Sequence, residues 1–250
     1  MLIDTHCHIH EADYPLDVDN VIIRAHQAGV MQMICVGTDY ASSRLAIEFA
    51  SKHDGVFASV GVHPHEAKEG LKGLTDLIDP DNSSTVAIGE IGLDYYHNHS
   101  PRDVQIQVLQ SQIELAIKHN LPIIFHVRGA LDDFWPVFDN FSGIRGELHS
   151  FTDTMRNVEE GLKRGLYIGV NGYSTFTKDE SQKAMFAAIP IEKLLLETDA
   201  PFLTPVPFRG KVNEPAFVRN IAEYQGMIRQ ISFDEVAITT TANARALFGI

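Results

Sequence analysis

The chain has 250 residues and a formal net charge of −13 at pH 7. No apolar run approaches the roughly 20 residues that cross a bilayer, and no signal-peptide pattern opens the sequence. We therefore expect a cytoplasmic protein with no membrane partner, present as a monomer or weak oligomer. The acidic charge excludes a broad basic surface for nucleic acid, so any contact with DNA must be local.

Short apolar, β-rich runs recur along the chain and predict eight strands. Their ranges are 1–8, 31–37, 56–63, 85–92, 121–127, 144–150, 165–170 and 193–199. Helical periodicity fills the stretches between them, most clearly at 16–29, 41–55 and 103–120. This alternation predicts an α/β fold, a (β/α)8 TIM barrel formed by residues 1–250 as a single domain. A doubly wound open sheet is the alternative, but the glycine-rich phosphate loop that it requires after an early strand is missing.

Several local signals fix where elements begin and end. Pro101 suits the start of the helix at 103–120, and Asn120 suits its end. A capping box at Ser232 and Glu235 predicts the start of a final helix. The predicted apolar stripe of the 103–120 helix comprises Val104, Val108, Leu109, Ile113, Ala116 and Ile117. Residues 79–84 are expected to form a surface loop.

The segment "DTHCHIH" places histidines at every second position. Side chains of a strand alternate between its two faces, so His6 and His8 should point to the same side and Cys7 to the other. His10 follows where the strand bends away, and we interpret it as a loop residue. Cys7 and Cys35 are expected to be buried, reduced thiols.

Residues whose side chains commonly bind metal ions fall at the ends of five predicted strands. They are His6, His8, Glu90, His126, His149 and Asp199. The carboxyl ends of barrel strands meet at one mouth, where four imidazoles and two carboxylates make a metal-ligand set. Six donors exceed one tetrahedral site, so we predict two divalent ions, with Mg, Mn or Zn as candidates. Glu90 should bridge them.

The expected division follows the order of the strands. His6, His8 and Asp199 come from neighbouring strands one and eight and should hold one ion. His126 and His149 come from strands five and six and should hold the other. Asp4 and Glu197 lie two residues before predicted ligands and could orient the histidines.

Further polar groups are predicted to bind substrate. His63 and His65 follow the third strand, although His63 could instead cap that strand. Arg128 follows His126 on the same face, and Arg209 and Lys211 lie in the loop after the eighth strand. Such cations suit an anionic substrate, especially a phosphate.

The motifs "DTHCHIH", "GVHPH", "GEIGLDYY", "FHVR", "LLLETDAPFLTP" and "PFRGKVNEP" resemble those of TatD-related metal-dependent deoxyribonucleases, a family of amidohydrolase-like barrels. The resemblance extends along the whole chain. It implies a (β/α)8 fold, a divalent-metal centre and phosphodiesterase activity on DNA. It also implies that the six residues named above are the metal ligands. Many related amidohydrolases bridge their metals through a carbamylated lysine, where this chain has Glu90.

The predicted function is cleavage of DNA phosphodiesters by a hydroxide that the two metals activate, at single-stranded ends or in short oligonucleotides. Asp199 would accept the proton of water, and Glu90 would act structurally and electrostatically. The alternative enzyme is a metal-dependent deacylase or amidohydrolase acting on an aminoacyl-tRNA or a small metabolite. A binding protein on an inactive barrel would show gaps in the ligand set, and this set is complete.

Overall fold

The computed structural model describes residues 1–79 and 83–250, in which strands alternate with helices. The strands are β1 (Leu2–Cys7), β2 (Val30–Val36), β3 (Val56–Val60), β4 (Thr85–Asp94), β5 (Ile123–Arg128), β6 (Gly146–Leu148), β7 (Tyr167–Val170) and β8 (Leu194–Leu196). The helices are α1 (Val18–Gln27), α2 (Tyr40–Ala50), α3 (Arg102–His119), α4 (Leu131–Phe138), α5 (Met155–Lys163), α6 (Glu180–Ala188), α7 (Val218–Arg229) and α8 (Phe233–Phe248). All eight predicted strands are present, but β1, β3, β6, β7 and β8 are shorter than expected, and His8 lies just beyond the end of β1. Residues 80–82 of the predicted loop lie outside the described part.

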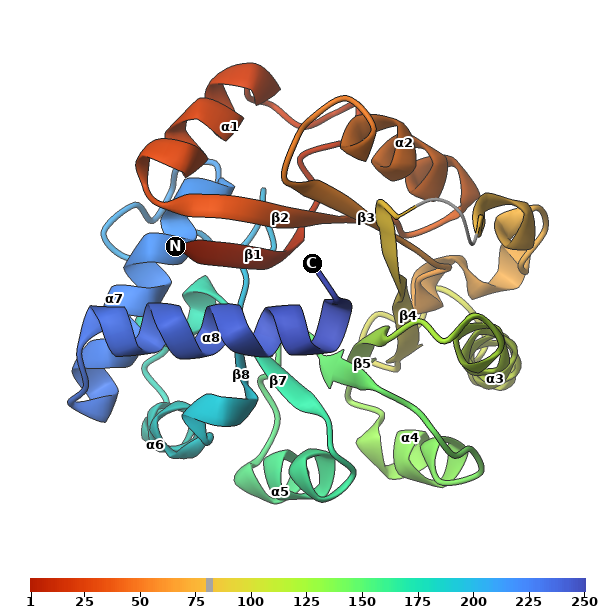
Figure 1. Cartoon of the computed structure of the whole chain (residues 1–250). Coiled ribbons are helices and arrows are strands. Elements are labelled where there is room, and N and C mark those ends of the chain that lie inside the picture. The colour runs from red at the N-terminus through yellow and green to blue at the C-terminus, as the bar shows by residue number, and fades with distance from the viewer. Residues whose placement is uncertain (80–82) are drawn as a thin grey trace. The chain divides into compact units, whose positions relative to one another are not determined.

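The chain divides into two compact units. Unit 1 comprises Met1–Cys35 and Ser150–Ile250. Its strand β1 pairs in parallel with β2, with Cys7 opposite Cys35, and β7 pairs in parallel with β8. A parallel bridge joins Cys7 to Ala200, so the segment after β8 runs beside the end of β1. Helix α8 packs against β1 and β8 (Figure 1).

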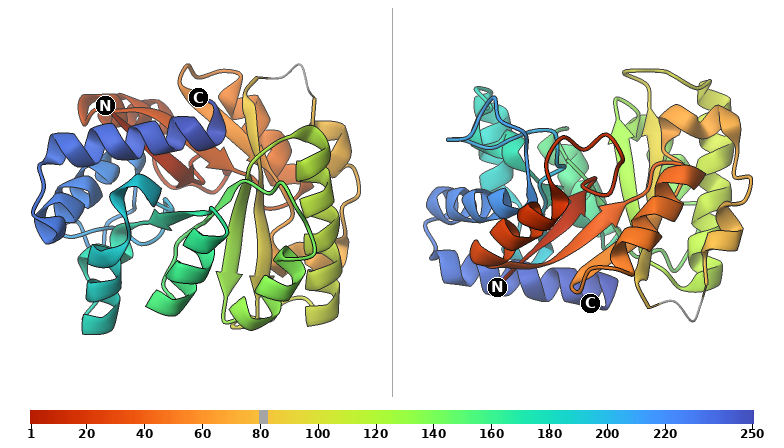
Figure 2. Two further views of the ribbon diagram at one scale, coloured as in Figure 1. Left: turned by 60° about the horizontal axis from the view of Figure 1, so that its bottom comes forward. Right: turned by 90° about the horizontal axis from the view of Figure 1, so that it is seen from above.

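Unit 2 comprises Val36–His149 and holds β3, β4, β5 and β6, paired in that order and all parallel. The long strands β4 and β5 lie side by side (Figure 2), and their pairing extends to Asp94 and Arg128. Gly92 allows their close approach, because its φ is 153° and a Cβ there would lie 1.8 Å from the carbonyl oxygen of His126. A side chain at that position would push His126 away from β4.

Helix ends agree with the local signals. Pro101 is the N-cap of α3, and Asn120 is its C-cap with a left-handed φ of 52°. The Ser232 side chain accepts a hydrogen bond from the Glu235 amide at the start of α8.

The stripe predicted for α3 is wrong at Ile117, which is 40% exposed. Gln105 and Gln112 are fully buried instead. Gln112 accepts from the Val62 amide at 2.7 Å, and Gln105 accepts from the Asp94 amide at 2.8 Å. The buried face of α3 therefore includes polar groups that satisfy the backbone beyond β3 and at the end of β4.

Both cysteines are free thiols and buried, as predicted. Cys7 Sγ donates to the Ile34 carbonyl at 3.4 Å and points away from the histidines beside it. No helix in the described part of the chain combines the length and the apolar character that crossing a bilayer requires.

Candidate metal centre

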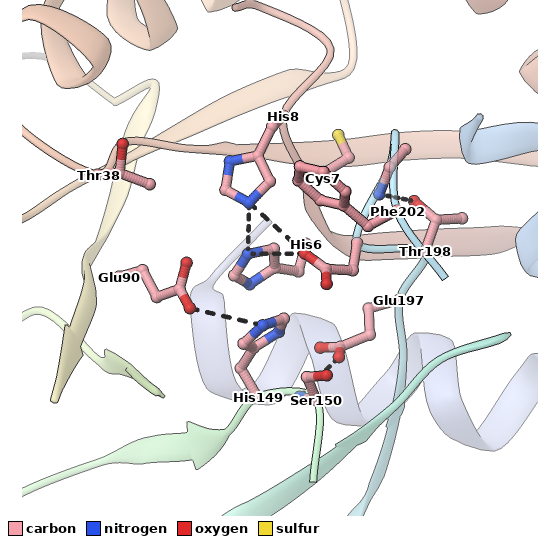
Figure 3. Close-up of polar contacts among 12 residues, drawn as sticks. His6, Cys7, His8, Thr38, Glu90, His149, Ser150, Glu197, Thr198 and Phe202 are labelled. Atoms are coloured by element: carbon pink, nitrogen blue, oxygen red, sulfur yellow. Dashed lines mark hydrogen bonds and ion pairs between the residues drawn. The ribbon is translucent and has the colours of Figure 1, made fainter. Parts of the chain in front are cut away.

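Unit 1 brings together His6, His8 and Asp199. The Nε2 atoms of the two histidines face each other at 3.1 Å (Figure 3). Asp199 Oδ1 lies 3.8 Å from His6 Nε2 and 3.6 Å from His8 Nε2. Asp199 follows β8 and has a left-handed φ of 57°, which few residues other than glycine adopt and which is common at functional sites. Its amide donates to the His6 carbonyl at 2.9 Å, which ties the two ligand-bearing segments together.

These distances suit a chelated divalent cation. Metal–nitrogen bonds of about 2.1 Å place neighbouring ligand atoms roughly 3.0 to 3.4 Å apart in octahedral and tetrahedral sites. The His6–His8 separation of 3.1 Å falls in this range, and the carboxylate lies a few tenths of an ångström beyond it. Two neutral imidazoles and one carboxylate are a ligand set that zinc and similar ions accept. The residues present in unit 1 therefore fit a metal ion.

Two buried carboxylates of unit 1, Asp4 and Glu197, accept hydrogen bonds from the backbone. Asp4 Oδ1 accepts from the Thr198 amide at 2.8 Å and Oδ2 from the Thr198 hydroxyl at 2.5 Å. Burial raises the pKa of Asp4 well above its usual value. Glu197 Oε1 accepts from the Ser150 amide at 2.7 Å. Asp4 therefore positions the backbone that leads into Asp199.

His10 lies beyond β1, in the loop where the sequence places it, but it is buried. Its Nε2 lies 3.3 Å from Glu11 Oε1. Burial lowers the pKa of His10, but Cys35 and Glu11 outweigh that effect and raise it to about 9.

In unit 2, three imidazoles surround Glu90. Its Oε1 lies 2.7 Å from His126 Nδ1 and 3.6 Å from Nε2 of both His63 and His149 (Figure 3 shows the His149 contact). The prediction that Glu90 ends the fourth strand is wrong, because β4 continues to Asp94. Glu90 therefore lies inside β4, at the point where its pairing with β5 shifts register between Ile88 and Ile91. Ligand atoms of His63, Glu90 and His126 all lie within 4.8 Å of one another, close enough to hold a metal ion.

The protonation of the two neighbouring histidines differs. Burial lowers the pKa of His63 well below its usual value, which favours the neutral imidazole. Burial also lowers the pKa of His126, but the charges of Glu90 and Asp94 outweigh that effect and raise it to about 9. A cation that binds His126 must displace this proton.

Asp94 is a functional candidate that the sequence reasoning missed. It is fully buried at the end of β4, and its Oδ2 lies 3.2 Å from His126 Nε2. The same atom lies 2.9 Å from His65 Nε2 and 2.9 Å from His97 Nδ1. These histidines hold the pKa of Asp94 low although burial raises it. Asp94 thus orients His126 through the ring nitrogen opposite Glu90, an arrangement common behind metal-binding histidines.

The predicted substrate-binding cations differ in their surroundings. The Arg128 guanidinium is exposed and lies over the ring of Tyr96, with 4.3 Å between Cζ and the ring centroid. Arg209 instead donates to the Thr204 carbonyl at 2.7 Å, within its own loop. Lys211 lies near an aromatic ring of the same loop. His63 and His65 lie beside Glu90 and Asp94.

Known proteins resemble this chain in sequence and in fold. The family model described as TatD related DNase matches residues 3–249. A metal-dependent hydrolase of Bacillus subtilis, YabD, is 38% identical over the full length of both chains. The 3'-5' ssDNA/RNA exonuclease TatD of Erwinia amylovora is 32% identical, again over the full length of both. The crystal structure of YjjV, a TatD homologue from Escherichia coli, superposes with a TM-score of 0.92 at 27% identity, covering 100% of this chain and 98% of that one.

These likenesses confirm two predictions. The fold is the (β/α)8 TIM barrel, since YjjV covers the whole chain at that TM-score. The curated relatives and the ligand groups of the two units agree that the protein is a metal-dependent hydrolytic enzyme. The chain belongs to the family of TatD-related DNases.

Proposed function

We propose that the protein is a dinuclear metal-dependent nuclease that removes nucleotides from single-stranded DNA ends or short oligonucleotides. The observation that carries this proposal is the pairing of carboxylate and imidazole in each unit. Asp199 faces two histidine nitrogens in unit 1, and Glu90 faces three in unit 2. We further propose that residues 1–250 act as one catalytic domain.

The proposed ligands follow the division expected from the sequence. His6, His8 and Asp199 would hold one divalent cation, and His126 and His149 the other, with Glu90 shared. The position of His63 Nε2, 3.6 Å from Glu90 Oε1, adds it as a further candidate ligand in unit 2. When bound, such cations lower the pKa of water toward neutrality and offset the negative charge of a phosphate.

The side chains of the protein have separate tasks in this proposal. The Asp199 carboxylate accepts a proton from the attacking water, since it is partly exposed and lies beside His8. Glu90 and Asp94 hold the His126 ring between them. Arg128 binds a phosphate oxygen with its exposed guanidinium, and the exposed ring of Tyr96 offers a surface on which a base stacks.

The net charge and the described activity of two relatives favour a single-stranded end over a duplex as the substrate. A net charge of −13 repels long duplexes, which need a basic track. The relatives from Erwinia amylovora and Salmonella typhimurium carry the description 3'-5' ssDNA/RNA exonuclease, at 32% and 33% identity. We therefore propose attack at the 3' end.

The test begins with purified protein from which metals have been removed by a chelator. Mg²⁺, Mn²⁺ and Zn²⁺ are restored separately, and cleavage is followed on a 5'-labelled single strand, the matching duplex and a closed single-stranded circle. We expect no cleavage without metal, stepwise shortening from the 3' end with at least one ion, and a resistant circle. Glu90→Gln serves as the inactive control.

Two results would contradict the proposal. Cleavage of the circle at the rate of the linear strand would exclude an exonuclease. Failure of every ion to restore phosphodiester cleavage, together with hydrolysis of an ester or amide reporter, would establish the deacylase alternative instead.

A further inference from the structure

A second group of metal-ligating side chains lies in unit 2, outside the predicted set of six. It consists of His65 in the 3-10 helix Pro64–Glu69, Asp94 at the end of β4, and His97 in the turn that follows. Ligand atoms of these three residues all lie within 4.8 Å of one another. We propose that His65, Asp94 and His97 form an accessory site for a first-row divalent transition-metal ion.

The geometry of Asp94 directs one oxygen toward the two histidines. Its Oδ1 accepts from the backbone amides of Tyr96 and His97, each at 2.9 Å. The other oxygen, Oδ2, lies 2.9 Å from both His65 Nε2 and His97 Nδ1. Neighbouring ligands around an octahedral ion with bonds of about 2.1 Å are separated by roughly 3 Å. Both nitrogen–oxygen distances match such an edge.

More imidazole nitrogens surround Asp94 Oδ2 than it can accept hydrogen bonds from. His126 Nε2 also approaches Oδ2, at 3.2 Å, so three imidazole nitrogens converge on one atom. One carboxylate oxygen offers about two lone-pair positions, which three N–H donors exceed. If His65 and His97 present lone pairs to a cation, only His126 needs to donate to Asp94. Two histidines and one carboxylate with open positions are a set that iron, manganese, cobalt, nickel and zinc accept.

The site is reachable from solvent. The side chains of His65 and His97 are 27% and 37% exposed, whereas Asp94 is fully buried behind them. The exposed ring of His99 lies with its centroid 4.5 Å from that of His65, which places a further imidazole at the open side. A cation could therefore enter, bind the two exposed rings and contact the buried carboxylate, and His99 is available as an additional ligand.

The proposed role of the accessory ion is to position Asp94 and, through it, the His126 ring. An ion held by Asp94 Oδ2 would fix the carboxylate that faces His126, and so stabilise the orientation of that ring. None of the three proposed accessory ligands belongs to the six predicted for catalysis, so the accessory site can be tested by its metal content, separately from nuclease activity.

The test measures metal content rather than activity. Full-length protein freed of metal is dialysed to equilibrium against Zn²⁺, and bound zinc is determined by atomic emission. His97→Gln and His65→Gln should each bind about one zinc ion fewer than the wild type, because each removes one ligand. His26→Gln is the matched control, since it removes an exposed histidine of unit 1, and should bind as much zinc as the wild type.

A third substitution distinguishes the loss of a metal ligand from misfolding. His97→Cys keeps a zinc ligand at the position and should recover the lost equivalent, with an unchanged melting temperature in all variants. Equal zinc content in the wild type and His97→Gln would overturn the proposal, as would an equal loss in His26→Gln. Because zinc is counted directly, a protein that cleaves no DNA would still show the difference.

Discussion

The two ligand groups are built in different ways. In unit 1, His6 lies in β1 and His8 directly follows it, so one short segment supplies both nitrogens, which lie 3.1 Å apart. In unit 2, Glu90 meets imidazoles that come from separate segments, and Asp94 holds one of them from behind. The two histidines of unit 1 therefore come from one short segment, whereas those of unit 2 come from separate segments that meet around Glu90 and Asp94. A single substitution should be more local in its effect in unit 1 than in unit 2.

The largest expected effect is a loss of kcat when Asp199, the proposed carboxylate ligand of unit 1, is replaced. Asp199→Asn keeps the shape but removes the proton acceptor, so kcat on a single-stranded oligonucleotide should fall by about 10²- to 10⁴-fold. The measurement is kcat at saturating metal, with the melting temperature as the control for folding. Turnover within tenfold of the wild type in a stable variant would remove Asp199 from the mechanism.

The next effect concerns Asp94, the carboxylate behind His126 in unit 2. Asp94→Asn weakens the orientation of His126, so the metal concentration needed for half-maximal activity should rise about 10- to 100-fold. A titration of activity against Mn²⁺ measures the shift. An unchanged titration would mean that Glu90 alone orients His126, and that the network in unit 2 adds nothing.

Asp4 provides the counterpart in unit 1. It receives hydrogen bonds from both the amide and the hydroxyl of Thr198, and Asn can replace only one of these acceptors. Asp4→Asn should therefore reduce the free energy of unfolding by about 1–3 kcal/mol. Chemical denaturation measures this loss. A rise in metal requirement as large as that of Asp94→Asn would contradict the contrast between the two units.

The two regions also differ in how far the sequence predicts them. The spacing of His6 and His8 was sufficient to predict that their rings lie together, because strand side chains alternate and His8 directly follows β1. Pro101 and Asn120 likewise marked the ends of α3 correctly. These features depend only on residues that are close together in the sequence, so they can be predicted without knowledge of the rest of the chain.

The arrangement of side chains around Asp94 could not be predicted from the sequence. The sequence "DYYH" contains a signal, since an aspartate often accepts from amides two and three residues later, and this turn brings His97 back to Asp94. His65 and His126 reach the same oxygen from other segments, and no local pattern predicts that convergence. The apolar pattern of α3 likewise did not include Gln105 and Gln112, which are buried because they bind the backbone near β3 and β4, whereas Ile117 is exposed.

The smallest expected effect is on KM, when each of two arginines predicted to bind substrate is replaced, one in each unit. The Arg128 guanidinium is exposed in unit 2, whereas Arg209 already donates to the Thr204 carbonyl and lies 3.7 Å from the Phe176 ring centroid in unit 1. Arg128→Gln should raise KM by about 3- to 10-fold, the loss of one charged phosphate contact. It should also weaken the dependence of KM on salt, because one fewer phosphate is neutralised. Arg209→Gln should leave KM within about twofold, since its guanidinium is engaged by its own loop. Steady-state kinetics at two salt concentrations separate these outcomes, and equal effects of the two substitutions would show that the loop after β8 reaches substrate as closely as β5 does.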